Sequence, residues 1–360
     1  MKIGLVTNYL DAHKGGGELS VFPLLNKLKK RHRLSIFNVS ENRENGSELL
    51  DDIFTNNWKV PHLLTGQYLP FQWRKLGVEI LSNHALSKLI EKEQPDLLIV
   101  IDPAMIKPLS RLKIKTIFFV HGLDWQYYKK FAGWMSIIRN EIAGRIRNFR
   151  NKRIFGKMDL IIANSNAMSI KLREFGLNST PLETVYPFIS LSSYQVEEKS
   201  GTEKYITFIN PTYLKGLEIF CQIVKRLPQQ PFLVVGKKDD KLNHFSNVTC
   251  CDWCDDIKDI YRKTSIILYP SICDEGFGRI PIEAGINGIP TIASHRGGLP
   301  ESVGKGGILI DNPYNIGAWL VAINEVKSNY STFSDNARGH AACFSLEKNF
   351  NHFRKMVKCH

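Results

Sequence analysis

Residues 274–285 read DEGFGRIPIEAG and closely follow the apolar segment 266–270. If that segment ends a buried strand and a helix begins after the glycines, residues 276–278 form a tight turn whose backbone N–H groups can bind an anion. Glu275 then lies at the carboxyl end of the strand. Glu283 lies about two helical turns further on, where its carboxylate can accept hydrogen bonds from ribose hydroxyls. The spacing therefore predicts a nucleotide site in a parallel α/β sheet, although two glutamates without these neighbours would more often mark a solvent-exposed helix face.

Short apolar segments recur along the whole chain, with helical segments between them. Continuous apolar strands that alternate with helices indicate a parallel sheet buried on both faces. The 360 residues are too many for one ordinary core and suit two such domains. The polar segment 190–204 lacks helical or strand periodicity and is the predicted linker. The predicted strands are 2–7, 34–38, 97–101, 115–120 and 160–163 in the first domain, and 205–209, 232–235, 266–269, 290–293 and 307–310 in the second.

Residues 275–284, EGFGRIPIEA, resemble the signature of the retaining glycosyltransferases of family 4, E-G-F-G-x-x-x-x-E-A. Segments 288–294, 297–301 and 307–311 follow in the order that the family shows. The resemblance implies the GT-B architecture, an α/β fold in which two Rossmann-like doubly wound parallel-sheet domains face each other across a cleft. The implied parts are an N-terminal acceptor-binding domain (1–190), a C-terminal nucleotide-sugar-binding domain (191–345) and a C-terminal helix that crosses back to the first domain (346–360).

The resemblance also implies a donor site in the second domain. Lys215 follows its first strand, where an open parallel sheet binds phosphate, and can act as a cation on a diphosphate. The family carries an Arg where this chain has Asn210; Arg279 could replace that cation, or could be an exposed residue at the start of a helix. Trp253 could stack on the base or pack in the core. The donor-binding residues implied are Gly16, Gly17, Asn210, Lys215, Trp253, Gly276, Phe277, Gly278, Arg279 and Glu283.

The first domain offers two candidate site segments. Gly15, Gly16 and Gly17 follow the first strand and let the backbone approach a ligand closely, and the family directs this loop towards the diphosphate and the acceptor. His121 ends another strand, where it can hydrogen-bond a sugar hydroxyl, as the family's His does. Asn164 and the following Ser match the end of a family strand and suggest a structural role. The implied catalytic residues are His121, Glu275 and Lys215.

The implied reaction moves a sugar from a nucleotide diphosphate sugar, with a UDP-sugar favoured, to a hydroxyl acceptor with retention at the anomeric carbon. It needs positive charge on the departing diphosphate, from Lys215, and hydrogen bonds that hold an oxocarbenium-like sugar, from Glu275 and His121. The resembling enzymes need no divalent metal for the leaving group, so we expect neither a metal nor a cofactor. The acceptor is expected to be a glycan or a lipid-linked glycan in cell-surface polysaccharide assembly.

Positive charge is concentrated in the first half of the chain. Residues 1–190 carry 28 Lys and Arg against 17 Asp and Glu, which is +11 of the net +13. Within the segment 137–157 the apolar residues keep to one helical face and the arginines to the others. Such a helix could lie on an anionic membrane surface, or could be an ordinary packed helix with a solvated face. No recognised nucleic-acid fold surrounds it, so a nucleic-acid partner is not expected.

The remaining sequence features favour a cytoplasmic protein, with association at the inner face of the membrane as an option. No apolar run suits a secretory leader or a spanning helix. Seven cysteines, an odd number, indicate reduced thiols, and Cys250, Cys251 and Cys254 lack the partners of a metal site. Two alternative functions stay open. Asn210 is compatible with a nucleotide-binding scaffold without transfer activity, and the basic segment with a peripheral membrane-binding protein.

Overall fold

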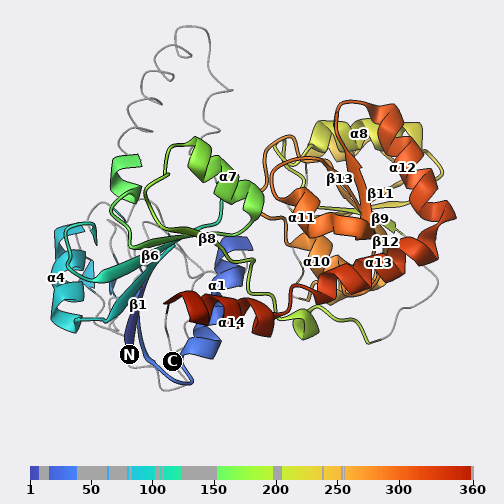
Figure 1. Ribbon diagram of the computed structural model, residues 1–360. Coiled ribbons are helices and arrows are strands. Elements are labelled where there is room, and N and C mark those ends of the chain that lie inside the picture. Colours follow the sequence, from blue (N-terminus) through green and yellow to red (C-terminus); the bar gives the residue numbers. More distant parts are fainter. Residues whose placement is uncertain are drawn as a thin grey trace, which may run out of the picture. The chain divides into compact units, whose positions relative to one another are not determined.

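The computed structural model describes residues 1–7, 16–38, 63–64, 79–80, 83–101, 106, 109–122, 152–197, 205–236, 239–252, 254 and 256–357. Trp253 and the basic segment up to residue 151 lie outside these residues. The chain divides into two compact units, Met1–Tyr186 with Phe350–His360, and Pro187–Asn349 (Figure 1). Each unit is built around its own parallel sheet.

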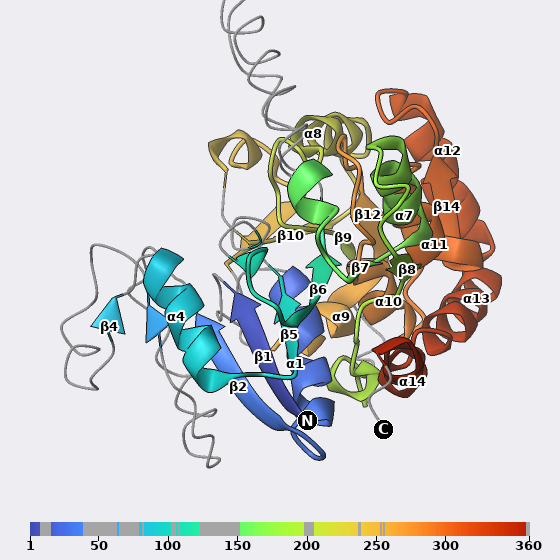
Figure 2. The same cartoon turned by 60° about the vertical axis from the view of Figure 1, so that its left-hand side comes forward.

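The first unit contains a six-stranded sheet in the order β2-β1-β5-β6-β7-β8, in which every pair of neighbours is parallel (Figure 2). Two of its strands, β5 and β7, are continuous apolar runs that are buried along their whole length, as expected for strands covered on both faces. The strands are β1 (Lys2–Thr7), β2 (Arg33–Asn38), β5 (Leu97–Val100), β6 (Lys115–Val120), β7 (Leu160–Ala163) and β8 (Leu182–Thr184). A separate parallel pair joins β3 (Leu63–Leu64) and β4 (Glu79–Ile80). The helices are α1 (Gly16–Leu28), α4 (Asn83–Glu93) and α7 (Asn166–Glu174).

The second unit contains a six-stranded parallel sheet in the order β11-β10-β9-β12-β13-β14. Counted from the first strand of the unit this is 3-2-1-4-5-6, the order of the Rossmann fold. The strands are β9 (Tyr205–Ile209), β10 (Phe232–Val235), β11 (Val248–Cys251), β12 (Thr264–Tyr269), β13 (Thr291–Ser294) and β14 (Gly307–Ile310). The helices are α8 (Leu217–Arg226), α9 (Lys258–Lys263), α10 (Ile280–Gly285), α11 (Leu299–Val303), α12 (Ile316–Ser328) and α13 (Tyr330–Ala342).

Alternate side chains of the second sheet enter two separate cores. Ile206 and Phe208 of β9 pack with α8 and α12, whereas Ile209 packs with α9, α10 and α11. Because successive side chains of a strand point to opposite faces, β9 is covered by helices on both sides. Trp319 of α12 is fully buried, and its Nε1 donates to the carbonyl oxygen of Pro313 at 2.9 Å.

The fold agrees with the α/β prediction and adds elements that the apolar runs did not indicate. All ten predicted strands are present, with small shifts at their ends. Two edge strands, β8 and β11, were not predicted because their sequences, LET and VTCC, are not continuous apolar runs. Cys250 and Cys251 lie on β11, where Cys251 Sγ is 3.6 Å from the carbonyl oxygen of Val234 in the neighbouring strand. No group of three or more His, Cys, Asp or Glu side chains in the described residues could hold a metal ion.

The predicted linker and the C-terminal helix are partly described. Residues 187–197 belong to the second unit and include a 3-10 turn, η2 (Leu191–Ser193). Helix α14 (Leu346–Val357) begins in the second unit, and its residues from Phe350 onward belong to the first. There the rings of Phe353 and Phe119 lie 5.8 Å apart between centroids. Of the helices in the described ranges, none is long and apolar enough to cross a membrane.

Candidate active site

The second sheet has a topological switch point between β9 and β12, where the strand order reverses. Lys215 follows β9, and Glu275 follows β12. Loops that leave the carboxyl ends of two such strands run in opposite directions, so they open a crevice in which α/β proteins bind ligands. The two charged residues predicted from the sequence therefore lie together at the expected ligand-binding edge.

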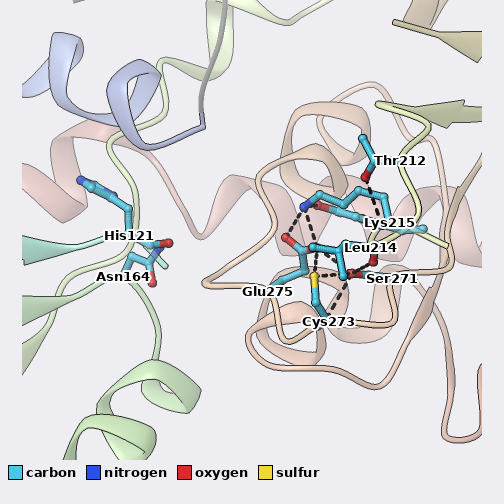
Figure 3. A network of polar contacts seen from close by, with 9 residues as sticks. His121, Asn164, Thr212, Leu214, Lys215, Ser271, Cys273 and Glu275 are labelled. Atoms are coloured by element: carbon cyan, nitrogen blue, oxygen red, sulfur yellow. Dashed lines mark hydrogen bonds and ion pairs between the residues drawn. The ribbon is translucent and has the colours of Figure 1, made fainter. Parts of the chain in front are cut away.

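Lys215 and Glu275 form an ion pair at this edge (Figure 3). Lys215 Nζ lies 2.6 Å from both carboxylate oxygens of Glu275. The side chains are 23% and 10% exposed, respectively, so the pair is largely shielded from water. Lys215 Nζ also lies 3.4 Å from the hydroxyl of Tyr269, the last residue of β12. The site thus holds a cation whose charge is already balanced by a carboxylate.

The surroundings keep Lys215 charged. Burial alone would lower its pKa, but Tyr269 and Glu275 more than offset this effect and raise the pKa above its usual value. Burial, together with the charge of Glu275, raises the pKa of the Tyr269 hydroxyl, so Tyr269 is a neutral phenol at physiological pH. Lys215 is therefore positively charged at physiological pH.

The turn after Glu275 is locked by a second glycine-rich loop. Glu275 pairs with Gly297 in a parallel bridge, and Gly298 N donates to Glu275 O at 2.8 Å. A Cβ on Gly298 would lie 2.4 Å from Gly276 O, so only glycine permits this approach.

Within the turn itself, the Phe277 ring is buried, with its centroid 5.3 Å from that of Phe344. Gly276 is buried as well, and Gly278 has a positive φ of 82°. The side chain of Phe277 thus belongs to the core and does not line an open site.

The second glutamate of the motif lies in a separate buried network. Arg279 Nε is 3.0 Å from Glu283 Oε1, with the side chains 8% and 10% exposed. Glu283 Oε2 accepts from the hydroxyl of Tyr261 at 3.1 Å. Arg279 Nη2 donates to the hydroxyl of Tyr194 at 2.8 Å, which fixes the segment after η2. Arg279 is therefore not the exposed residue that one of the two expectations described. Its guanidinium is committed to Glu283 and Tyr194 in this structure.

Asn210, at the position of the family Arg, has an unusual backbone conformation. Its φ is +62°, and it is one of two non-glycine residues with positive φ in the part of the chain that is described. Asparagine tolerates this left-handed region better than most residues, because its short side chain can hydrogen-bond locally. The conformation therefore favours Asn at this position. Unlike the family Arg, the Asn side chain carries no charge.

Gly216, between Lys215 and α8, has a strict steric requirement. Its φ is +88°, and a Cβ there would lie 1.8 Å from the carbonyl oxygen of Pro270. We expect Gly216→Ala to lower the free energy of unfolding by about 2 to 4 kcal/mol, measured by urea denaturation. Gly339 of α13 is the matched control, because a Cβ there meets nothing within 4 Å. Gly339→Ala should stabilise the protein by about 0.5 to 1 kcal/mol, and a similar loss in both variants would contradict the argument.

The described part of the first unit contains His121 and the start of α1. His121 directly follows β6, and its ring stacks on Phe119 with centroids 6.1 Å apart. Asn164 Nδ2, at the end of β7, donates to the carbonyl oxygen of His121 at 2.9 Å. This bond ties the ends of two neighbouring strands and gives Asn164 the structural role that was expected. Ser165 caps α7 by accepting from Met168 N at 3.0 Å. Gly16 and Gly17 are the first residues of α1, and the loop before them lies outside the described residues.

The structure also brings in residues that the sequence did not single out. Ser271 and Cys273 contact Glu275, and Tyr194 contacts Arg279. A Pro-Ser pair directly after a buried strand was the available signal for Ser271. Nothing in the local sequence indicated Tyr194, because it lies 85 residues from its partner.

Comparison with known protein families covers both units. The profile described as "Glycosyltransferase Family 4" matches residues 14–193, which is half of the chain. The profile described as "Glycosyl transferases group 1" matches residues 203–329. The chain belongs to the GT-B glycosyltransferases. Gly16 and Gly17 lie within the range of the first profile, and Lys215 and Glu275 lie within that of the second.

Individual relatives of this glycosyltransferase are distant. An uncharacterized 42.6 kDa protein in the cps region of Klebsiella pneumoniae is 25% identical over 84% of this chain and 87% of its own length. The D-inositol 3-phosphate glycosyltransferase of Mycobacterium sp. strain KMS is 25% identical over 56% of this chain and 52% of its own. The crystal structure of HepE from Anabaena in complex with UDP has a TM-score of 0.75 at 15% identity, covering 99% of this chain and 100% of that one. At that identity the similarity is one of fold.

Proposed function

We propose that this glycosyltransferase transfers a sugar from a nucleotide diphosphate sugar to a hydroxyl acceptor, with retention at the anomeric carbon as in family 4. The observation that carries the proposal is the ion pair of Lys215 and Glu275 at the switch point of the second sheet. One cation and one carboxylate at this edge match the two charges that such a transfer develops: negative on the diphosphate and positive on the sugar.

Each residue has a distinct part in the proposed reaction. Lys215 binds the diphosphate and stabilises the negative charge that grows on it as the bond to the sugar breaks. Glu275 accepts hydrogen bonds from the sugar and stabilises its positive character. The carboxylate faces a charged lysine, so it remains a hydrogen-bond acceptor for the sugar. His121 in the first unit would bind a sugar hydroxyl, and the backbone of Gly16 and Gly17 would approach the diphosphate.

A UDP-sugar is the favoured donor. HepE from Anabaena, which shares the fold, has been solved with UDP and with UDP-glucose. The proposed acceptor is a glycan or a lipid-linked glycan in cell-surface polysaccharide assembly. The basic surplus of residues 1–190 supports contact with an anionic membrane surface on the cytoplasmic side. We further propose that Lys215 takes the role of a divalent metal on the leaving group, so that no metal is required.

Calorimetric titration tests the donor class. UDP, GDP and ADP are titrated into the wild type in the presence of a chelator, and we expect UDP alone to bind with a dissociation constant in the micromolar range, about 10⁻⁶ to 10⁻⁴ M. Retention is then examined by NMR of the anomeric proton in the product formed from UDP-glucose. Binding that required Mg²⁺ would contradict the metal-independent mechanism. If none of the three nucleotides bound, the donor proposal would be wrong and a non-catalytic scaffold would be the better description.

A further inference from the structure

The two oxygens of the Glu275 carboxylate have unequal surroundings. Oε1 accepts a hydrogen bond from Ser271 Oγ at 2.7 Å and lies 3.7 Å from Cys273 Sγ. Lys215 Nζ reaches both oxygens at 2.6 Å (Figure 3). Oε1 therefore has two donors, Ser271 and Cys273, that Oε2 does not share. A carboxylate oxygen can accept two or more hydrogen bonds, so Oε2 has capacity for a further donor.

The surroundings of Ser271 favour a hydrogen bond from its hydroxyl to Glu275. The residue is fully buried, two positions after the end of β12. Its Oγ also lies 3.3 Å from Leu214 O and 3.1 Å from Cys273 O. A serine hydroxyl carries one hydrogen, and hydrogen bonds to an ionised acceptor are shorter and stronger than those to a neutral carbonyl. Ser271 Oγ therefore donates its hydrogen to Glu275 Oε1, which lies 2.7 Å away.

We propose that Ser271 is a positioning residue that holds Oε1 of Glu275 and thereby presents Oε2 to the sugar. The inference rests on the proposed sugar transfer. In the ligand-free protein Lys215 alone could hold the carboxylate, since it grips both oxygens. A diphosphate draws Lys215 towards itself, and the donors that then remain on Oε1 are Ser271 and Cys273. Of these the hydroxyl is the stronger donor, because a thiol is only a weak one.

Kinetics of Ser271→Ala test this role. With UDP-glucose as the probe and its slow hydrolysis as the reaction, we expect kcat to fall about 10- to 100-fold, as for loss of a hydrogen bond to a charged group. KM for UDP-glucose and the dissociation constant of UDP should stay within roughly threefold, because the diphosphate contacts are intact. Ser271→Cys, which keeps a weaker donor, should give an intermediate kcat.

Ser265→Ala is the matched control. Ser265 is also buried, lies at the opposite end of β12 and donates to the carbonyl oxygen of Tyr205 at 3.1 Å. The kcat of Ser265→Ala should match that of the wild type. If Ser271→Ala lowered kcat no more than Ser265→Ala, or raised KM and the UDP dissociation constant together with it, the positioning role would be wrong.

A pair of crystal structures separates this inference from the proposed function. In Lys215→Met without ligand, Ser271 should keep Glu275 in its present orientation. In the double variant Lys215→Met/Ser271→Ala the carboxylate should turn away. If the wild type bound no UDP, the donor proposal would fail, and these two structures would still decide whether Ser271 sets the orientation. A carboxylate that turned in the single variant would overturn the inference.

Discussion

Replacing Glu275 with glutamine is expected to lower the rate of sugar transfer by about 10²- to 10³-fold. The amide keeps the shape of the side chain and removes the negative charge that stabilises the sugar as its bond to the diphosphate breaks. The same change frees Lys215, which lies 2.6 Å from both oxygens of the native carboxylate. UDP should therefore bind several-fold more tightly to Glu275→Gln, roughly 3- to 10-fold, while turnover falls.

Opposite changes in affinity and rate make this variant informative. The rate is measured as release of UDP from UDP-glucose under single-turnover conditions, and the affinity by calorimetry. Glu325→Gln, on an exposed face of α12, is the control and should change neither quantity. A variant that kept the wild-type rate would show that Glu275 does not stabilise the sugar. Weaker UDP binding would show that the ion pair assists the diphosphate site instead of competing with it.

Replacing Lys215 with methionine is expected to weaken UDP binding by about 10²-fold. The change removes the cation of the Lys215–Glu275 pair at the switch point. Asn210, where the family has an Arg, has no charge to compensate, and Arg279 is committed to Glu283 and Tyr194. Lys215→Arg should recover only part of the affinity, because a planar guanidinium does not fit the space of an ammonium held by two carboxylate oxygens.

The same variant should lose stability, because it leaves the Glu275 carboxylate, 10% exposed, without its cation. We expect the free energy of unfolding to fall by about 1 to 3 kcal/mol in urea denaturation without ligand. Lys241→Met is the matched control: Lys241 pairs with Glu218, but both side chains are more than half exposed, at 58% and 53%. Such a surface pair contributes little, so its loss should leave both stability and UDP affinity unchanged.

A double variant distinguishes the two effects of Lys215. In Lys215→Met/Glu275→Gln the buried carboxylate no longer carries a charge, so much of the lost stability should return. UDP affinity should remain low, because the cation is still absent. Recovery of affinity together with stability would mean that Lys215 acts on the nucleotide only through the fold.

The strands and the positions of Lys215 and Glu275 at strand ends were predictable because they depend on patterns that are local in the sequence. Each predicted strand is an apolar run of four to six residues, and such runs are buried in a parallel sheet whatever their neighbours are. Strands β8 and β11 were not predicted because polar residues interrupt their sequences, LET and VTCC, so that neither gives a continuous apolar signal. Lys215 and Glu275 were expected at the carboxyl edge of the second sheet because each lies in the loop that follows a predicted strand.

Contacts between distant residues were decided by the tertiary structure alone. Arg279 and Glu283 lie four residues apart, and a helical pair at that spacing can be read from sequence. The other partners of this pair cannot: Tyr261 comes from α9, and Tyr194 from the segment after η2. Their positions depend on strand order and on how the helices pack, which no local pattern encodes. The expected role of Glu283, accepting hydrogen bonds from ribose hydroxyls, stays a prediction. In the structure its two carboxylate oxygens already contact Arg279 and Tyr261.

The sequence by itself determined the fold class, the two sheets and the two charged residues, Lys215 and Glu275, that follow strands of the second one. These features could be read from the sequence because residues close together in the chain determine where an apolar run is buried and where a strand ends. Only the tertiary structure decided how the charges are used: Lys215 is neutralised by Glu275, and Ser271 holds one oxygen of that carboxylate. Hydrogen bonds depend on tenths of an ångström between atoms on different loops, and those distances exist only once the sheet has brought the loops together.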